Sequence, residues 1–238
     1  MTRVPAACAF AAVAALGLVA ALAGCSPDPV PRTLTVQADS TVGPVVATAA
    51  RALEAEFPGL TVQVDSSGPA DVFVLADAEQ VRRVDADGPA VALARSGLVV
   101  VGRPGAEPAP TLASALAPAR TVGIAEGDAS GRLARKALVA AGEWEGLATR
   151  LVRFETTQAA LDSVASRYTD VAFALAADAL SSTPYAVVYR LRDDEAAPAV
   201  VQGVARRDAP PEARALLDAL AAPTAYRAWA AAGFRPPP

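Results

Sequence analysis

The sequence predicts an α/β fold with two lobes, each a largely parallel sheet flanked by helices. Short apolar segments alternate with amphipathic segments of helical period through most of the chain. Two such sets follow one another, and Pro58-Gly59 and Gly142 each end a helical segment. Strands that alternate with helices favour a parallel sheet, because each parallel connection needs a crossover that a helix can supply.

The first set begins with an expected strand at 33–37 and an expected helix at 42–57. The apolar residues Ala49 and Leu53 of this helix are about one turn apart. Asp77 has a residue type that can cap the helix that follows it. Further strands are expected at 60–64, 71–74, 90–93 and 97–101, and a proline-broken loop at 103–110.

The second set has the same alternation and closes with two helices. Strands are expected at 121–124, 151–154, 171–174, 185–189 and 199–205. Helices are expected at 130–141, 156–167, 211–221 and 224–231. In open sheets of this kind, ligands lie beyond the carboxyl ends of the strands, where helices begin. Helix N-termini carry unpaired N–H groups and partial positive charge, so the pattern favours an anionic ligand.

The first residues predict export. Arg3 precedes a stretch, 4–23, that is almost wholly apolar and contains no acid, which is typical of a signal peptide or of one membrane span. The stretch ends in Leu22-Ala23-Gly24-Cys25, which resembles a lipobox. The resemblance implies that 1–24 are a lipoprotein signal peptide and that Cys25 becomes the lipidated first residue. An uncleaved anchor helix is the alternative.

Composition excludes several kinds of function. The chain contains no histidine, which removes the usual zinc ligands, the Ser-His-Asp triad and the Cys-His pair. Cys8 lies in the apolar stretch and Cys25 is the lipidation site, so no disulfide is expected. Asp162, Asp170 and Asp178 are expected to be surface or capping residues. We therefore expect no enzyme, no metal site and no cofactor.

Charge and length restrict the possible partners and the number of domains. The net charge of the 238 residues is −4, and removing Arg3 with the signal peptide leaves 20 basic and 25 acidic residues, or −5. This mildly acidic chain has no basic run, so nucleic acid is not an expected partner. Cleavage would leave 214 of the 238 residues, enough for one large domain or two small lobes. They would begin with a flexible tether, 25–32, that contains three prolines.

Several blocks, in order, resemble one family. They are 33–62, Pro69-Ala-Asp-Val-Phe73 with Ala76-Asp77, 127–138, 142–144, 150–161, 170–180 and 226–236. Together they are similar to the molybdate-binding periplasmic proteins of ABC importers, over nearly the whole chain beyond the tether. Asp39-Ser-Thr-Val-Gly-Pro44 also looks like the first turn of phosphate-binding proteins.

The resemblance implies a two-lobed clamp that holds a tetrahedral dianion through hydroxyl and backbone N–H groups. The first lobe would comprise 33–95 and 198–238, and the second 96–197. The expected protein is then a monomeric lipoprotein, anchored by its lipid to the membrane and facing the periplasm or the cell exterior. It would capture molybdate, tungstate or a related oxyanion and pass it to an ABC importer permease.

Six residues fall at or near the family's ligand positions. The resemblance implies hydroxyl contacts from Thr41 and Ser40, and from Ser67 of the pair Ser66-Ser67 near the second hydroxyl position, and backbone N–H contacts from Ser130 and Thr157. Each has an ordinary structural alternative. Thr41 could cap the helix at 42–57, Ser67 could lie in a solvated turn, and Ser130 and Thr157 could each cap their own helix.

The sequence departs from the family pattern at three places. Leu175 aligns with a tyrosine whose hydroxyl donates to the oxyanion, and leucine cannot donate. The turn between Ser67 and Pro69 is shortened. Asp39 would repel a dianion if it faced the cleft, and we expect it instead to point away and cap its turn. These departures favour weaker molybdate binding or another ligand.

They also keep a second function open. A divergent solute-binding-like lipoprotein could act in sensing or protein interaction, with an altered or lost ligand site. An exported hydrolase is disfavoured, because the chain has no histidine and its one cysteine after removal of 1–24 is the lipidation site Cys25, so neither can act as a catalytic base.

Overall fold

The computed structural model describes residues 30–181 and 185–237. The predicted signal peptide, the lipidation site Cys25 and most of the predicted tether lie outside these residues. Among the described helices, none is both long and apolar enough to span a membrane. Arg32–Pro238 form one compact unit, whose architecture follows.

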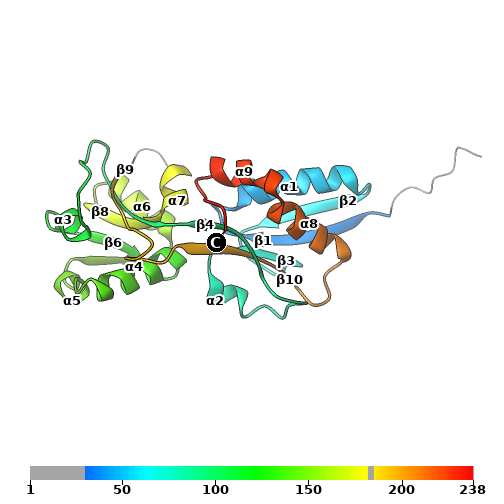
Figure 1. Cartoon of the computed structure of the whole chain (residues 1–238), viewed down its shortest axis with the longest axis horizontal. Helices are drawn as coiled ribbons and strands as arrows, with labels where there is room; N and C mark the ends of the chain where they lie inside the picture. Colours follow the sequence, from blue (N-terminus) through cyan, green and yellow to red (C-terminus); the bar gives the residue numbers. More distant parts are fainter. Residues whose placement is uncertain (1–29, 182–184, 238) are drawn as a thin grey trace, which may run out of the picture. The chain divides into compact units, whose positions relative to one another are not determined.

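The first lobe is built on a five-stranded sheet with the order β2-β1-β3-β10-β4 (Figure 1). Its strands are β1 (Arg32–Ala38), β2 (Leu60–Asp65), β3 (Val72–Leu75), β4 (Val91–Ser96) and β10 (Ala199–Ala205). β1 pairs in parallel with β2 and β3, whereas β10 runs antiparallel to both β3 and β4. Three neighbouring strands therefore end at the same edge of this sheet.

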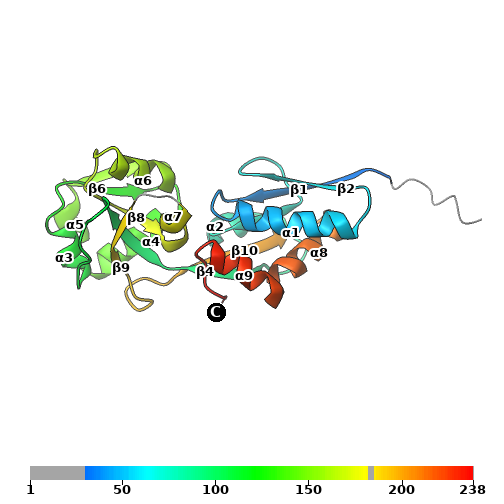
Figure 2. The same cartoon turned by 90° about the horizontal axis from the view of Figure 1, so that it is seen from above.

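Helices cover both faces of the first sheet. They are α1 (Gly43–Glu56), α2 (Ala78–Val81), α8 (Pro211–Ala221) and α9 (Tyr226–Ala231), with a short 3₁₀ helix at Pro223–Ala225. α1 packs beside α8, and Leu53, Leu216 and Trp229 belong to one buried core (Figures 1 and 2). α2 covers the opposite face, where Val81 packs with Leu75. The last helices thus complete the lobe that the first strand begins.

The second lobe repeats this plan with the strand order β7-β6-β8-β5-β9. Its strands are β5 (Leu98–Gly102), β6 (Val122–Ala125), β7 (Leu151–Phe154), β8 (Val171–Leu175) and β9 (Ala186–Arg190). Its helices are α3 (Leu112–Leu116), α4 (Ala129–Ala140), α5 (Trp144–Leu147), α6 (Thr157–Ala165) and α7 (Ala176–Ser181). Phe173 of β8 packs with α3, α4 and α5, and Ala174 with α6 and α7. Both faces of the central strands are therefore buried (Figure 1).

The predicted α/β fold with two lobes is confirmed, although each sheet is mixed rather than largely parallel. The chain leaves the first sheet from β4 through the single residue Gly97 into β5, and returns from β9 through 191–198 into β10. A chain that goes out and comes back through neighbouring strands must run antiparallel there. β5 accordingly pairs antiparallel with β8 and β9. Only β6 and its two neighbours β7 and β8 are parallel in this sheet.

Candidate functional site

A cavity of about 260 Å³ lies where elements of both lobes meet. Its lining comprises Asp39, Ser40, Thr41, Val42, Ser66, Ala76, Asp77, Gln80, Asp128, Ala129, Ser130, Thr156, Thr157, Gln158, Leu175, Asp178 and Phe234. Most of these residues directly follow the carboxyl ends of β1, β2, β3, β6, β7 and β8. This is where open α/β sheets place their ligands.

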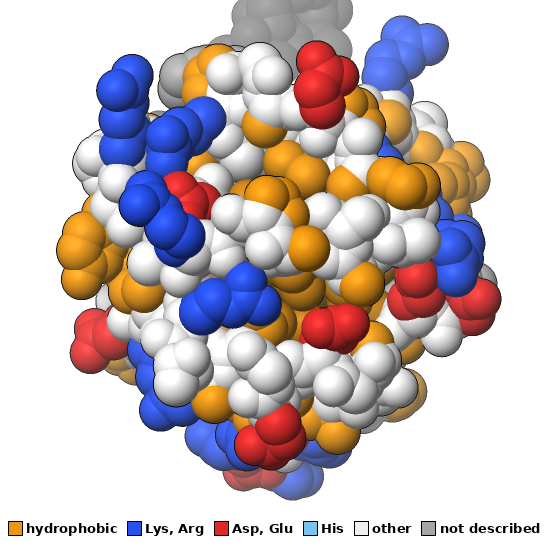
Figure 3. All heavy atoms as spheres, turned by 90° about the vertical axis from the view of Figure 1, so that its left-hand side faces the viewer, with side chains coloured by type: hydrophobic (Ala, Val, Ile, Leu, Met, Phe, Trp, Pro, Cys, Tyr) orange, Lys and Arg blue, Asp and Glu red, His pale blue; other side chains and the backbone are white. Residues whose placement is uncertain are grey.

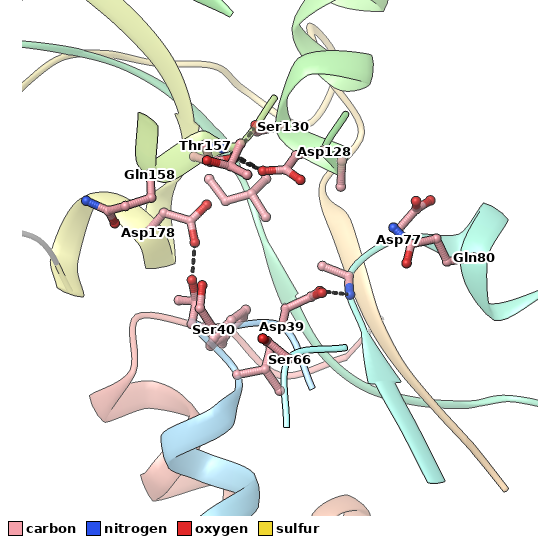
Figure 4. A pocket seen from close by; sticks show the side chains of 17 residues that line it. Asp39, Ser40, Ser66, Asp77, Gln80, Asp128, Ser130, Thr157, Gln158 and Asp178 are labelled. Atoms are coloured by element: carbon pink, nitrogen blue, oxygen red, sulfur yellow. Dashed lines mark hydrogen bonds between the residues drawn. The ribbon is translucent and has the colours of Figure 1, made fainter. Parts of the chain in front are cut away.

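Four of the five predicted ligand residues line this cavity: Ser40, Thr41, Ser130 and Thr157. Ser67 does not, and its neighbour Ser66, the first residue after β2, takes that place. Figure 4 shows Ser40 and Ser66 on the side of the first lobe, and Ser130 and Thr157 opposite them on the second. The tertiary structure therefore brings together side chains from separate parts of the sequence.

Thr41 does not cap α1. The N-cap residue is Val42, which makes no side-chain hydrogen bond there. The Thr41 hydroxyl instead donates to Oδ1 of Asp178, at the start of α7. This contact joins the turn after β1 to the second lobe. The hydroxyl that was expected to donate to an anionic ligand therefore already donates to a carboxylate of the chain.

Ser130 and Thr157 belong to a second internal network. Thr156, not Thr157, caps α6, since its Oγ1 accepts from the N–H of Ala159 at 3.2 Å. The backbone N and the Oγ1 of Thr157 lie 2.5 and 2.9 Å from Oδ2 of Asp128. Ser130 Oγ lies 2.7 Å from Thr157 Oγ1, and both residues are buried (Figure 4). The donors of Thr157 therefore also have a carboxylate partner within the chain, whereas the Ser130 hydroxyl is bonded to Thr157.

Asp39 lies in the cavity wall, so the expectation that it points away is wrong. Its Oδ2 accepts from the N–H of Ala76 at 2.7 Å (Figure 4). The turn after β1 is closed by the backbone oxygen of Asp39, which accepts from the N–H groups of Val42 and Gly43. Burial raises the pKa of Asp39, and the nearby charges of Asp128 and Asp77 add to this rise, while the Ala76 hydrogen bond opposes it.

Asp178 also lines the cavity, so its assignment as a surface or capping residue is wrong. It lies in the first turn of α7, a six-residue helix too short to give a clear period in the sequence. Burial raises the pKa of Asp178 to about 6, and the charges of Asp128 and Asp39 add to the rise. The hydrogen bond from Thr41 opposes it. This carboxyl therefore titrates near neutral pH.

Asp77 connects the two lobes at the rim of the cavity. As predicted, it caps α2, because its Oδ1 accepts from the N–H of Glu79 at 2.9 Å. Its Oδ2 lies 2.5 Å from a guanidinium nitrogen of Arg132 on α4. Arg132 faces neighbouring hollows rather than the cavity itself. Four carboxylates thus line the cavity, and no lysine or arginine does.

A glycine fixes the helix that carries part of this wall. A Cβ atom on Gly131 would lie 1.8 Å from the backbone oxygen of Ala125, the last residue of β6. Only glycine therefore allows α4 to start so close to the end of that strand. The sequence shows Ser130-Gly131 at a helix start, but nothing in it indicates this close approach.

Comparison with solved structures identifies the same fold. The Azotobacter vinelandii periplasmic molybdate-binding protein has a TM-score of 0.69 at 19% identity, over 86% of this chain and 100% of that one. The substrate-binding domain of a putative molybdenum ABC transporter from Clostridium difficile gives 0.68 at 14%, over 86% and 98%. A Salmonella typhimurium periplasmic binding protein with high arginine specificity gives 0.57 at 16%, over 84% and 98%. The predicted resemblance to molybdate-binding periplasmic proteins is thus confirmed in the fold.

Comparison of the sequence gives the family. No curated protein sequence matches the chain significantly. The model of the bacterial extracellular solute-binding proteins matches residues 34–235, which is most of the chain. The chain therefore belongs to the bacterial extracellular solute-binding protein family, which implies an exported protein with a small solute as its ligand and an ABC importer permease as its partner.

Proposed function

We propose that this chain is the lipid-anchored substrate-binding protein of an ABC importer and captures a small solute in the cavity between its lobes. One observation carries the proposal: the walls of the cavity come from both lobes, at the carboxyl ends of their strands. A solute held there contacts both lobes at once. It can therefore stabilise a closed arrangement that the permease distinguishes from the open one.

The two segments through which the chain passes from one lobe to the other form the hinge. We assign 33–95 with 198–238 to one moving body and 96–197 to the other, joined at Gly97 and through 191–198. Closure then needs changes in few backbone angles, because each body keeps its own sheet and most of its own core. Binding and release of a solute need no covalent step, and we propose no enzymatic activity.

The proposal places the protein on a membrane through Cys25. Changing Cys25→Ala removes the thiol that receives the lipid, so the variant should leave the membrane fraction or remain as an unprocessed precursor. Fractionation and intact-mass measurement of the mature protein check this. An unchanged mass together with unchanged membrane association would show that Leu22 to Cys25 do not act as a lipobox.

A narrower proposal concerns the chemical class of the bound solute. The molybdate-binding relatives support molybdate, tungstate or a related oxyanion as the ligand. The cavity gives less support for an oxyanion ligand, because Thr41, Thr157 and Ala76 already donate hydrogen bonds to carboxylates of the chain. The fold itself accommodates other solutes, as the arginine-specific relative shows.

The same internal contacts favour a second candidate, a sensing or interaction protein whose ligand site is lost. Thr41 with Asp178 and Arg132 with Asp77 connect the two lobes through groups of the chain itself. A protein that has lost its solute would keep such contacts and would not respond to small molecules.

A solute screen separates the two candidates. The purified mature chain is mixed with molybdate, tungstate, sulfate, phosphate, amino acids and amines, and its thermal unfolding and small-angle X-ray scattering are measured. For a transport protein, at least one solute raises the melting temperature and lowers the radius of gyration, since a ligand at about 100 times its Kd adds about 2.7 kcal/mol of stability. If no solute of any charge changes either quantity, the solute-binding function is rejected.

A further inference from the structure

We propose that the cavity selects a small organic cation, a solute bearing an ammonium or guanidinium group, and discriminates against tetrahedral oxyanions. This inference rests on the proposed solute-binding function, because it names the class of solute that the cleft takes. It is carried by the charges of the cavity wall, by the use of its donors and by its unused acceptors.

The charged side chains that line the cavity are all acidic. Asp39, Asp128 and Asp178 line the cavity together with Asp77, and of these four Asp77 pairs with Arg132. Asp39 and Asp128 form no ion pair with any residue in the described ranges. A dianion placed among these carboxylates would be repelled, and a cation would be attracted, more strongly than in bulk water, because the site is partly shielded from solvent.

Two of the predicted anion-binding residues, Thr41 and Thr157, already donate to carboxylates of the chain. The Thr41 hydroxyl donates to Asp178, and the N–H and hydroxyl of Thr157 both point to Asp128. An oxyanion would have to displace these carboxylates from the groups that stabilise their charge. Leu175, which also lines the cavity, offers no donor in exchange.

The acceptors, in contrast, remain available. Asp39 and Asp128 each accept through Oδ2, and the Oδ1 atoms of both make no hydrogen bond within the described part of the chain. Figure 4 shows these two carboxylates extending from opposite sides, Asp39 from the first lobe and Asp128 from the second. Two carboxylates on facing walls suit a solute with several N–H donors, because each wall can accept from a different donor.

Spacing and size restrict the cation further. Within the described residues, no three acidic side chains lie close enough to coordinate a metal ion. A polyatomic cation can bridge carboxylates that a bare ion cannot reach together. The volume of about 260 Å³ is below the usual range of about 300–1,000 Å³ for pockets of drug-sized ligands. Val42, Leu175 and Phe234 give it apolar surface for a short carbon chain.

The acidic wall is a local feature of the cleft. On the end face of the second lobe, lysine and arginine side chains are interspersed with acidic ones (Figure 3). The chain as a whole carries 21 basic and 25 acidic residues, so its net charge does not by itself explain four carboxylates around one cavity.

The test measures solute binding to the mature chain by calorimetry at about pH 7.5. The probes are putrescine, agmatine, ethanolamine and L-arginine, compared with molybdate, tungstate and sulfate. We expect at least one amine or guanidine to bind with a Kd below about 100 μM, and the oxyanions to bind at least about tenfold more weakly.

Asp39→Asn and Asp128→Asn remove one charge each but keep an oxygen that can accept the existing hydrogen bond. Each should weaken binding of the cationic probe at least about tenfold and strengthen molybdate binding. A merely structural role for these residues would not move the two affinities in opposite directions. Asp218→Asn is the matched control, because Asp218 is exposed and pairs with Arg214 on α8, away from the cavity. It should leave both affinities unchanged.

Two results overturn the inference. One is a wild-type protein that binds molybdate or tungstate more tightly than every cationic probe. The other is the absence of binding by all four cationic probes at about 1 mM. The first leaves the solute-binding function intact and rejects only the charge class. The second, if the broad solute screen also finds no ligand, rejects the solute-binding function as well.

Discussion

Two hollows of this molecule share part of a wall and carry opposite charge. The cleft cavity is lined by four aspartates and no basic side chain. A neighbouring hollow of about 910 Å³, the basic groove, is lined by Arg82, Arg132, Arg135 and Lys136 with the acids Asp77 and Glu79. The two share Ala76, Asp77 and Ala129.

The difference lies in how each hollow is built. The basic groove takes Arg132, Arg135, Lys136 and Val139 from α4, which occupy positions i, i+3, i+4 and i+7 and so lie on one face of the helix. The cleft takes only the start of that helix, together with loops after several strands. A helix face can be recognised in a sequence, whereas a site made from strand ends depends on tertiary structure.

The largest expected effect comes from displacing α4, the helix that contributes residues to both hollows. Gly131→Ala places a Cβ against the backbone oxygen of Ala125, so α4 must move away from β6. We expect destabilisation at or above the upper end of the range of about 1–3 kcal/mol for overpacking, together with loss of solute binding. Urea unfolding measures the free energy.

Gly146→Ala on α5 serves as the control, because its Cβ would meet nothing within 4 Å. This variant should be neutral or slightly more stable. Equal stability of the two alanine variants would show that the close approach at Gly131 does not hold α4 in place.

The next effect is a pH dependence of stability that comes from Asp178 in the cleft cavity. The folded protein raises the pKa of Asp178 from 3.8 to about 6, so the folded state holds this proton more tightly than the unfolded state. Stability from this group is therefore highest below about pH 4, falls as pH rises to about 6, and stays low above it. The loss is on the order of 1–3 kcal/mol.

Asp178→Asn should remove this loss and unfold at higher urea concentration than the wild type at about pH 7.5, with little difference at about pH 4. Asp39 and Asp128 face the same cavity, and the raised pKa of Asp39 leaves some pH dependence in the variant. A variant that is less stable than the wild type at both pH values would contradict the burial of a charged Asp178.

A smaller effect is expected where the two hollows meet. Arg132→Gln removes the ion pair with Asp77 that joins α2 to α4. A partly exposed pair contributes about 1 kcal/mol or less, so the ratio of open to closed molecules should rise up to about fivefold. Scattering from the solute-free protein should then give a larger radius of gyration. Arg214→Gln, which breaks the exposed pair with Asp218, should leave it unchanged.

The smallest effect tests whether the two hollows act separately. Arg135→Gln and Lys136→Gln neutralise the basic groove without touching the cleft lining. The affinity for the solute of the cleft should change less than about twofold, because solvent and salt screen exposed charges. A change of about tenfold in calorimetry would show that the basic groove is part of the binding site.

The elements of this fold were predictable where their own residues carry a period. The strands at 151–154 and 199–205 and the helix at 211–221 have the predicted bounds. α3 and α7 were missed, because five or six residues give no clear period, whereas the equally short α2 was predicted from its cap residue Asp77. The mixed sheets were also missed, since strand direction depends on which strands become neighbours.

By itself, the sequence determined the α/β alternation, the absence of histidine, the hydroxyl residues near the strand ends and the resemblance to a solute-binding family. Only the tertiary structure decided what those hydroxyls do. Asp39, Asp128 and Asp178 come from three distant segments and meet in one cavity, where they accept from Ala76, Thr157 and Thr41, and two of these three, Thr41 and Thr157, were predicted to bind an oxyanion. Burial and mutual repulsion then raise the pKa of Asp39 and Asp178. These effects depend on distances in space, which the order of residues along the chain does not contain.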